Sequence, residues 1–123
     1  MLFRSRHALT AAACRAGVKA LGLELWAVPE EIASPTTTAI RVPAGYRDAD
    51  ILAAARDRYG VVFSTGRGAT KGKLLRIGHM GPVAEPIYAV VAVTALGGAL
   101  QKLGFACKPG VAVEAAMAVI AKA

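Results

Sequence analysis

The sequence has 123 residues and a formal net charge of +7. Its apolar share of 55% excludes a disordered chain, and an aromatic share of 6% favours close-packed helices over a sandwich made only of sheets. A domain of about this size buries roughly 60 to 70% of the surface of its unfolded chain, so residues 1–123 are expected to form a single domain with a genuine core.

The first predicted element is a helix that ends at Gly22, a residue type typical of helix C-termini. Apolar or small residues recur there at helical spacing: Leu9, Ala12, Ala13, Ala16 and Ala20. Basic residues precede the first acid, Glu24, as they do in mitochondrial presequences, but no long apolar secretory stretch is present. A cytoplasmic location is expected, with a mitochondrial one as the alternative.

Two short strands and a second helix follow. Residues 23–28 (LELWAV) alternate as a strand, and residues 36–42 (TTTAIRV) form another that ends at Pro43. Asp48 is the expected N-cap of the second helix, which closes at Gly60. Its apolar side chains are Ile51, Leu52, Ala55 and Tyr59.

Residues 61–64 (VVFS) and 74–77 (LLRI) predict two more strands, the first too apolar to be exposed on both faces. Residues 84–103 predict a long helix whose uncharged part is too short to span a bilayer, so no membrane partner is expected. A last helix carries Val113, Ala116, Met117 and Ile120 on one face. The order α-β-β-α-β-β-α-α predicts an α/β fold, an α+β sandwich with a small, mostly antiparallel sheet of about four strands packed with helices.

The two cysteines and the glycine-rich loop carry no recognisable chemistry. Cys14 and Cys107 lie in apolar surroundings without CxxC spacing, so they are expected to be reduced core residues, and no metal site is expected. Residues 65–73 match neither a Walker A motif nor a dinucleotide fingerprint, because the spacing fails and a strand follows. A connector between two strands is the expected structure.

Arg76 is the main candidate for a binding residue. It lies on the strand face opposite to Leu75 and Ile77 and is either a solvated charge or a clamp for a carboxylate in a cleft. His79 has no nucleophile or acid placed beside it in sequence, so a packed turn residue is expected and no catalytic residue is assigned. Nucleic-acid binding is not expected, because aromatic residues are too sparse for a stacking platform.

Three stretches resemble one known family: residues 34–45 (SPTTTAIRVPAG), 55–81 (ARDRYGVVFSTGRGATKGKLLRIGHMG) and 95–117 (ALGGALQKLGFACKPGVAVEAAM). They are similar to the C-terminal, small domain of class V, fold type I, pyridoxal-phosphate (PLP) aminotransferases of the alanine/serine–glyoxylate type. The most specific piece is GKLLRIGHMG at residues 72–81. The resemblance implies the small-domain fold of that family.

The resemblance also implies that Arg76 binds the α-carboxylate of an amino-acid or oxo-acid substrate in the cleft between small and large domains, and that Gly78 lets the chain turn away. The chain departs from the family pattern at Thr65-Gly66-Arg67, which could alter substrate choice. Neither Lys71 nor Lys73 matches the lysine that forms the Schiff base, because that lysine belongs to the large domain.

The chain is therefore expected to lack the large PLP-binding domain, to hold no cofactor and to be inactive alone. The full-length parent would use PLP, bind an amino-acid or oxo-acid substrate, and form a homodimer. It would transfer an amino group from alanine or serine to glyoxylate or pyruvate. A free-standing α/β binding or interaction module that has lost catalysis is the alternative, and whether the chain counts as an enzyme stays open.

Overall fold

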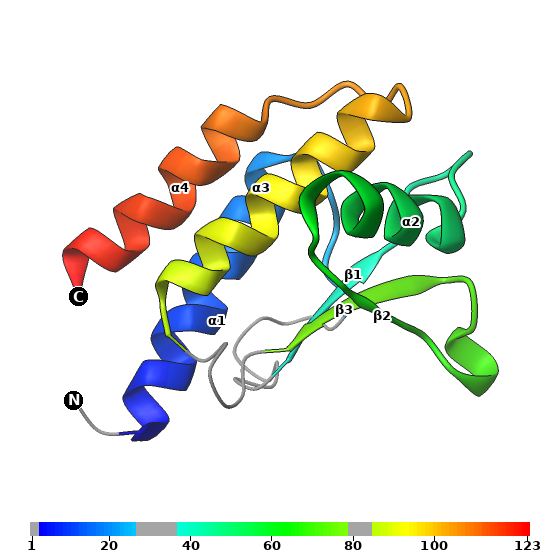
Figure 1. Ribbon diagram of the computed structural model, residues 1–123. Helices are drawn as coiled ribbons and strands as arrows, with labels where there is room; N and C mark the ends of the chain where they lie inside the picture. The colour runs from blue at the N-terminus through cyan, green and yellow to red at the C-terminus, as the bar shows by residue number, and fades with distance from the viewer. Residues whose placement is uncertain (1–2, 27–36, 79–84) are drawn as a thin grey trace.

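The computed structural model describes residues 3–26, 37–78 and 85–123 (Figure 1). The elements in order are α1 (Phe3–Ala20), β1 (Thr37–Arg41), α2 (Asp48–Tyr59), β2 (Ser64–Thr65), the 3-10 turn η2 (Gly68–Thr70), β3 (Leu74–Gly78), α3 (Ile87–Lys102) and α4 (Pro109–Lys122). The expected α/β fold, in which helices pack on a small antiparallel sheet, is confirmed.

The sheet has the strand order β1-β3-β2, and both pairings are antiparallel. About four strands were expected, whereas three form the sheet within the described residues. Of the strand predicted at residues 23–28, the described part, 23–26, contributes a single bridge, Leu25 to Ile40, and two backbone bonds. The Trp26 N–H donates to the Ala39 carbonyl at 2.9 Å, and the Arg41 N–H donates to the Glu24 carbonyl at 2.8 Å. This segment thus borders β1 without forming a longer ladder in its described part.

The strand predicted at residues 61–64 begins later, at Ser64. The Val61 N–H donates to the Ala55 carbonyl at 3.3 Å, so this residue belongs to the end of α2. Phe63 is buried, but Val62 is 74% exposed. The expectation that this apolar run is not exposed on both faces therefore agrees with the structure, in which Phe63 is covered and Val62 lies on the open side.

Glycines end three helices in the same way. Gly22, Gly60 and Gly104 have φ of +86°, +70° and +94°, values that L side chains rarely adopt. The residue after each glycine donates its N–H back to a carbonyl five or six residues earlier, as in the Leu23–Val18 bond of 3.3 Å. The ends predicted at Gly22 and Gly60 are confirmed. The start predicted for α2 is wrong by one residue, because Arg47 occupies the N-cap and Asp48 is the first helical residue.

The buried faces of two helices are rotated from those predicted. Of the five apolar or small α1 residues that recur at helical spacing, only Ala13 is fully buried. The buried side of α1 instead carries Ala11, Cys14, Val18 and two polar side chains, His7 and Thr10, and Leu21 directly after the helix is also buried. In α4 the core residues are Ala112 and Ala116, while Met117 is 44% exposed. Small residues allow close helix packing on more than one side, so spacing alone does not select the buried face.

Side chains from all four helices join Ile40, Leu75 and Ile77 of the sheet in one core cluster. The long apolar helix expected to be buried is α3, with nine buried residues. Gly17 of α1 lies so close to α3 that a Cβ built on it would stand 2.6 Å from Val93 Cγ1. Across the described ranges, no helix is long and apolar enough to cross a membrane.

Candidate functional site

Strand β3 divides its side chains between two faces of the sheet. Leu75 and Ile77 point into the core and pair with Ile40 and Thr38 of β1. Arg76 therefore points to the opposite face, as strand alternation predicts. Its side chain is half-buried, and its Nε is buried without a hydrogen-bond partner among the described residues. A guanidinium N–H left without an acceptor costs about 1–3 kcal/mol, so this atom is suited to receive an anionic ligand.

The neighbours of Arg76 on its own face are small. Ala39 of β1 and Ser64 of β2 lie directly opposite Arg76 in the two ladders. Side chains in such positions stand about 5 Å apart, and the side chains of Ala39 and Ser64 are both much shorter than that of Arg76. Sequence reasoning did not identify these two residues, because strand register is not visible from the sequence of one strand.

Arg41 lies on the same face but already has partners. Its guanidinium carbon stands 4.5 Å from the centroid of the Trp26 ring, and its Nε is 3.9 Å from a carboxylate oxygen of Glu24. A cation over an indole face is attracted by the ring, so Arg41 is held at the sheet margin. Of these two arginines, Arg76 is the one whose buried Nε lacks a partner in the described part of the chain.

The glycine-rich loop connects β2 to β3, as predicted. The Thr70 hydroxyl accepts from the Arg67 N–H at 3.0 Å and donates to the Arg67 carbonyl at 2.9 Å, which closes the 3-10 turn. Gly66 is buried, and a Cβ on it would collide with the Thr70 carbonyl. The hydrogen bonds within the loop therefore stabilise the hairpin. The loop is followed by a strand, whereas a phosphate-binding loop is followed by a helix whose N-terminus faces the phosphate.

The motif at residues 72–81 is described only as far as Gly78. His79 and the residues after it lie outside the described residues. Gly78 has an ordinary φ, and a Cβ on it would meet nothing within 4 Å. The described neighbours thus give no steric reason for glycine at this position.

The cysteines are both free thiols, as expected. Burial raises the pKa of Cys14 to about 12, and a smaller opposing effect comes from its hydrogen bond with the Thr38 side chain. Desolvation also raises the pKa of Cys107, whose Sγ lies 3.5 Å from the Gly97 carbonyl oxygen. Neither thiol has the lowered pKa of a nucleophile. In the described ranges no three His, Cys, Asp or Glu side chains group as metal ligands would.

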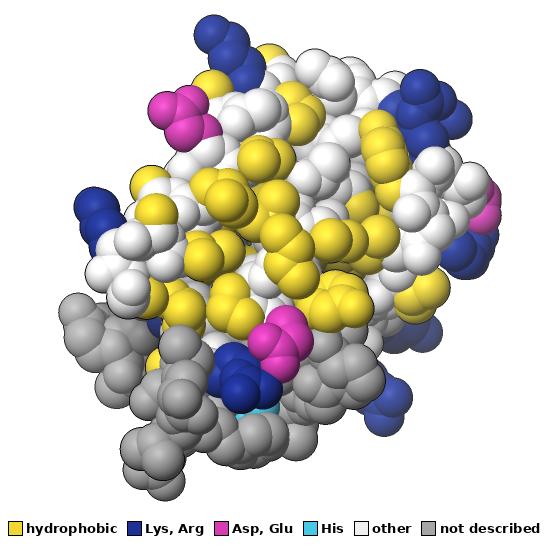
Figure 2. Space-filling model, turned by 60° about the vertical axis from the view of Figure 1, so that its left-hand side comes forward, with side chains coloured by type: hydrophobic (Ala, Val, Ile, Leu, Met, Phe, Trp, Pro, Cys, Tyr) yellow, Lys and Arg dark blue, Asp and Glu magenta, His cyan; other side chains and the backbone are white. Residues whose placement is uncertain are grey.

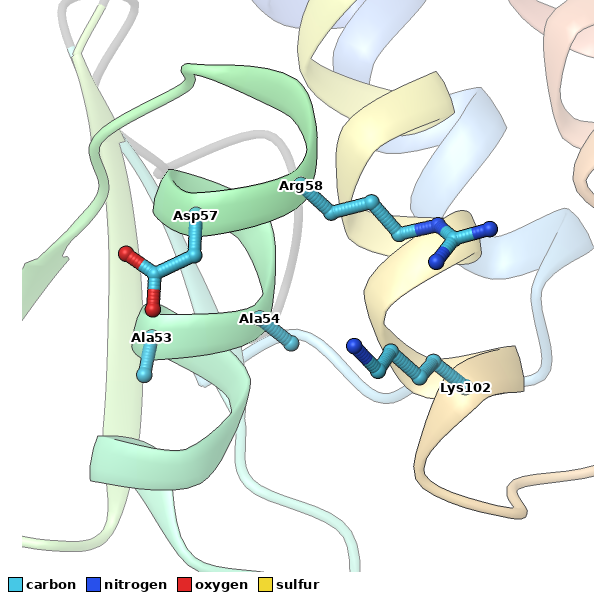
Figure 3. Close-up of a pocket in the computed structure, with 5 residues that line it drawn as sticks. All are labelled: Ala53, Ala54, Asp57, Arg58 and Lys102. Carbon is cyan, nitrogen blue, oxygen red and sulfur yellow. The ribbon is translucent and has the colours of Figure 1, made fainter.

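A separate hollow of about 430 Å³ lies on α2 and the end of α3, lined by Ala53, Ala54, Asp57, Arg58 and Lys102 (Figure 3). Arg58 and Lys102 extend from the two helices into the space between them. The Arg56 guanidinium, 2.9 Å from Asp57, lowers the pKa of that carboxyl, and Lys102 adds to the effect. Cations at helix C-termini interact favourably with the last carbonyls. The positive charges of Arg58 and Lys102 are therefore explained without a ligand bound in this hollow.

Known aminotransferases match this fold and this sequence. The pyridoxamine–pyruvate transaminase of Mesorhizobium japonicum is 61% identical over 116 residues, which are 94% of this chain and 30% of the relative. The crystal structure of that type of enzyme from Mesorhizobium loti superposes with a TM-score of 0.94 over 97% of this chain and 31% of that one. The ureidoglycine–glyoxylate aminotransferase of Bacillus subtilis gives a TM-score of 0.88 at 26% identity, covering 95% of this chain and 30% of that one.

The serine–glyoxylate aminotransferase of Methylorubrum extorquens is 37% identical over 114 residues, 90% of this chain and 27% of the relative. The chain is homologous to the C-terminal portion of class V aminotransferases. It spans about 30% of the length of the curated relatives it matches. No protein-family model matches the chain. Three sequence stretches indicated that this chain resembles the small domain of class V aminotransferases. The comparisons confirm that resemblance.

Proposed function

We propose that residues 1–123 act as the substrate-carboxylate-binding domain of a PLP-dependent aminotransferase, with Arg76 as the carboxylate ligand. The observation that carries this proposal is the buried, unpartnered Nε of Arg76 on the sheet face opposite the helical core. A carboxylate accepts two parallel N–H bonds from a guanidinium, which fixes both its position and its orientation. The contribution of Arg76 is therefore one of positioning the substrate for reaction.

The substrate class follows from the names of the relatives. They act on pyridoxamine and pyruvate, on aspartate and glyoxylate, or on serine and glyoxylate. Pyridoxamine has no carboxylate, whereas pyruvate and glyoxylate are both α-oxo acids. The group common to all three pairs is thus an oxo-acid carboxylate beside a carbonyl. We infer that Arg76 binds this carboxylate, and that alanine or serine is the corresponding amino acid where the donor is an amino acid.

The residues of this chain do not fit the role of holding PLP. Covalent attachment needs a lysine whose amine is deprotonated, usually by burial or by a neighbouring cation. All six lysines of the chain are described and all are exposed: Lys19, Lys71, Lys73, Lys102, Lys108 and Lys122. In the proposed enzyme PLP is therefore held by a large domain of the same polypeptide, and the enzyme is a homodimer.

The same exposed lysines support a second candidate, a free-standing module that has lost catalysis. The two candidates differ in the coding DNA. An in-frame large domain upstream of Met1 would support the aminotransferase domain, and a separate promoter and start site there would support the module. Sequencing that region distinguishes them before any protein is made.

The carboxylate proposal is tested in a chimera that joins the N-terminal portion of the Mesorhizobium japonicum relative to this chain. Arg76→Gln should lower kcat/KM for pyruvate by about 100-fold, because a charged bidentate contact of about 3 kcal/mol is lost. Arg76→Lys should recover part of this loss, because lysine restores the positive charge but cannot donate two parallel N–H bonds to the carboxylate. Arg58→Gln, an exposed arginine on α2, is the matched control. An Arg76→Gln chimera with unchanged pyruvate kinetics would refute the assignment.

A further inference from the structure

The two sides of Arg76 differ in chemistry and in exposure. In the ladders Arg76 pairs with Ala39 of β1 and with Ser64 of β2, so these three side chains lie on the same face of the sheet. Ala39 is half-buried, whereas Ser64 is exposed. Within the described part of the sheet, β2 is an edge strand. The more exposed side of Arg76 is therefore the one that carries a hydroxyl group.

The residues that follow Ser64 do not offer a second hydroxyl on this face. Thr65 pairs with Leu75, whose side chain points into the core, so Thr65 lies on the opposite face of the sheet. Gly66 returns to the face of Arg76, but a Cβ there would collide with the loop backbone. In β2 the hydroxyl beside Arg76 is thus that of Ser64. An exposed serine hydroxyl rotates to suit its partner and has one O–H to donate.

The helical side of the molecule is chemically different. Figure 2 shows hydrophobic side chains gathered on the face that α3 and α4 present, with charged side chains at its margin. A carboxylate that leaves water needs N–H or O–H groups to replace the hydrogen bonds that it loses. The face of the sheet opposite the core provides both kinds of donor on adjacent strands, in Arg76 and Ser64.

The position of the unpartnered nitrogen brings the two donors together. Among the described residues the buried atom of Arg76 without a hydrogen-bond partner is Nε, the guanidinium nitrogen nearest the backbone. A carboxylate that bonds to Nε and to one Nη lies close to the sheet. Paired side chains on adjacent strands have Cβ atoms about 5 Å apart, so a side chain as short as that of Ser64 reaches such a carboxylate. A carboxylate held by the two Nη atoms alone would lie farther out.

We propose that the Ser64 hydroxyl donates a hydrogen bond to the oxo-acid carboxylate that Arg76 binds, and that Ser64 is a second substrate-binding residue. This inference rests on the proposed function, since it concerns the same carboxylate. Two carboxylate oxygens have about four acceptor positions, so a bond from a hydroxyl adds to the two from the guanidinium. Donors on two strands hold the carboxylate in one orientation, which one long side chain alone does not ensure.

The test replaces Ser64 by two residues of nearly the same shape in the chimera described above. Threonine and valine both favour strands, but only threonine has a hydroxyl. Ser64→Val should lower kcat/KM for pyruvate by about tenfold, because a hydrogen bond to a charged group is lost. Ser64→Thr should stay within about threefold of the parent chimera. Both variants should keep its Tm within about 2 °C, since the position is exposed.

The amine substrate named for the Mesorhizobium japonicum relative provides an internal control. Pyridoxamine has no carboxylate, so its kcat/KM should change by less than about twofold in either variant. Equal kcat/KM for pyruvate in Ser64→Val and Ser64→Thr would overturn the role of Ser64. A loss in Ser64→Val that is as large for pyridoxamine as for pyruvate would overturn it too, because the effect would then be structural.

The Arg76→Gln chimera separates this inference from the proposed function. A loss of pyruvate kcat/KM in Arg76→Gln without one in Ser64→Val would refute the role of Ser64 and leave the carboxylate assignment of Arg76 standing. Unchanged kinetics in Arg76→Gln would refute both. If both residues bind one carboxylate, the double variant Arg76→Gln/Ser64→Val should lose less than the product of the two single losses. Two independent, multiplying losses would contradict a shared ligand.

Discussion

Cys14 lies at the centre of the contact between α1 and the sheet. It is fully buried, and its thiol has a hydrogen bond with the side chain of Thr38 on β1. Burial in apolar surroundings disfavours the charged thiolate, which is why the pKa of Cys14 rises to about 12. The thiol is therefore neutral at any physiological pH and acts as a small apolar core residue.

This raised pKa predicts a loss of stability at alkaline pH. Below pH 9 the thiol is protonated in both states, so Cys14 adds no pH dependence. Between pH 9.0, the ordinary pKa of a cysteine thiol, and the folded-state pKa of about 12, the unfolded chain loses its proton while the folded chain keeps it. The free energy of unfolding should then fall by about 1.4 kcal/mol per pH unit from this residue. Urea unfolding of wild type and Cys14→Ala at several pH values from 8 upward measures the difference.

The Cys14→Ala protein serves as its own control for the other alkaline groups, since tyrosines and lysines titrate in both proteins. Its stability should decline less steeply above pH 9 than that of the wild type. Parallel stability profiles for the two proteins would show that the thiol ionises equally in the folded and unfolded states. That result would contradict the assigned burial effect.

Among the elements, α1 and α3 approach each other closely at Gly17. A methyl group at Gly17 would stand 2.6 Å from Val93 Cγ1 and 3.2 Å from the Ala112 carbonyl oxygen. Val93 is fully buried and branched at Cβ, so it has little room to move. Gly17→Ala should destabilise the protein by about 1–3 kcal/mol through overpacking, despite the better helix propensity of alanine. Chemical denaturation measures this change.

Gly110 in α4 provides the opposite case. A Cβ on it would meet nothing within 4 Å, and its φ is not positive. Gly110→Ala should stabilise the protein by up to about 1 kcal/mol, because alanine restricts the unfolded chain and favours the helix. Stabilisation by both substitutions would mean that α1 and α3 are farther apart than the structure places them.

The helix ends and the strand faces were predictable from the sequence because local residues determine them. Gly22 and Gly60 adopt the positive φ that their type permits, and alternation places Arg76 on the face opposite to Leu75. The buried face of α1 was not predictable, because alanines on several sides allow neighbours on several sides. Which side of residues 61–64 is open was likewise not predictable, because apolar composition does not show which side the rest of the chain covers.

At the scale of the whole molecule, the candidate site depends on register that no single segment reveals. Motif similarity identified Arg76, but its flanking residues, Ala39 and Ser64, come from strands separated from it by many residues. The buried state of its Nε depends likewise on packing between distant segments. Long-range pairing therefore completes a site of which the sequence shows one residue.

The contiguous core predicts that the chain unfolds as one unit. Residues from α1, α2, α3, α4, β1 and β3 share a single buried cluster, so no element can leave without exposing the others. Trp26 is the sole tryptophan and borders β1 through its bond to Ala39, so its fluorescence reports the sheet side. Far-UV circular dichroism reports mainly the helices. The two signals should show the same urea midpoint, and Trp26→Phe should leave the helical transition nearly unchanged. A Trp26 transition at clearly lower urea would show instead that the sheet side separates before the helices unfold.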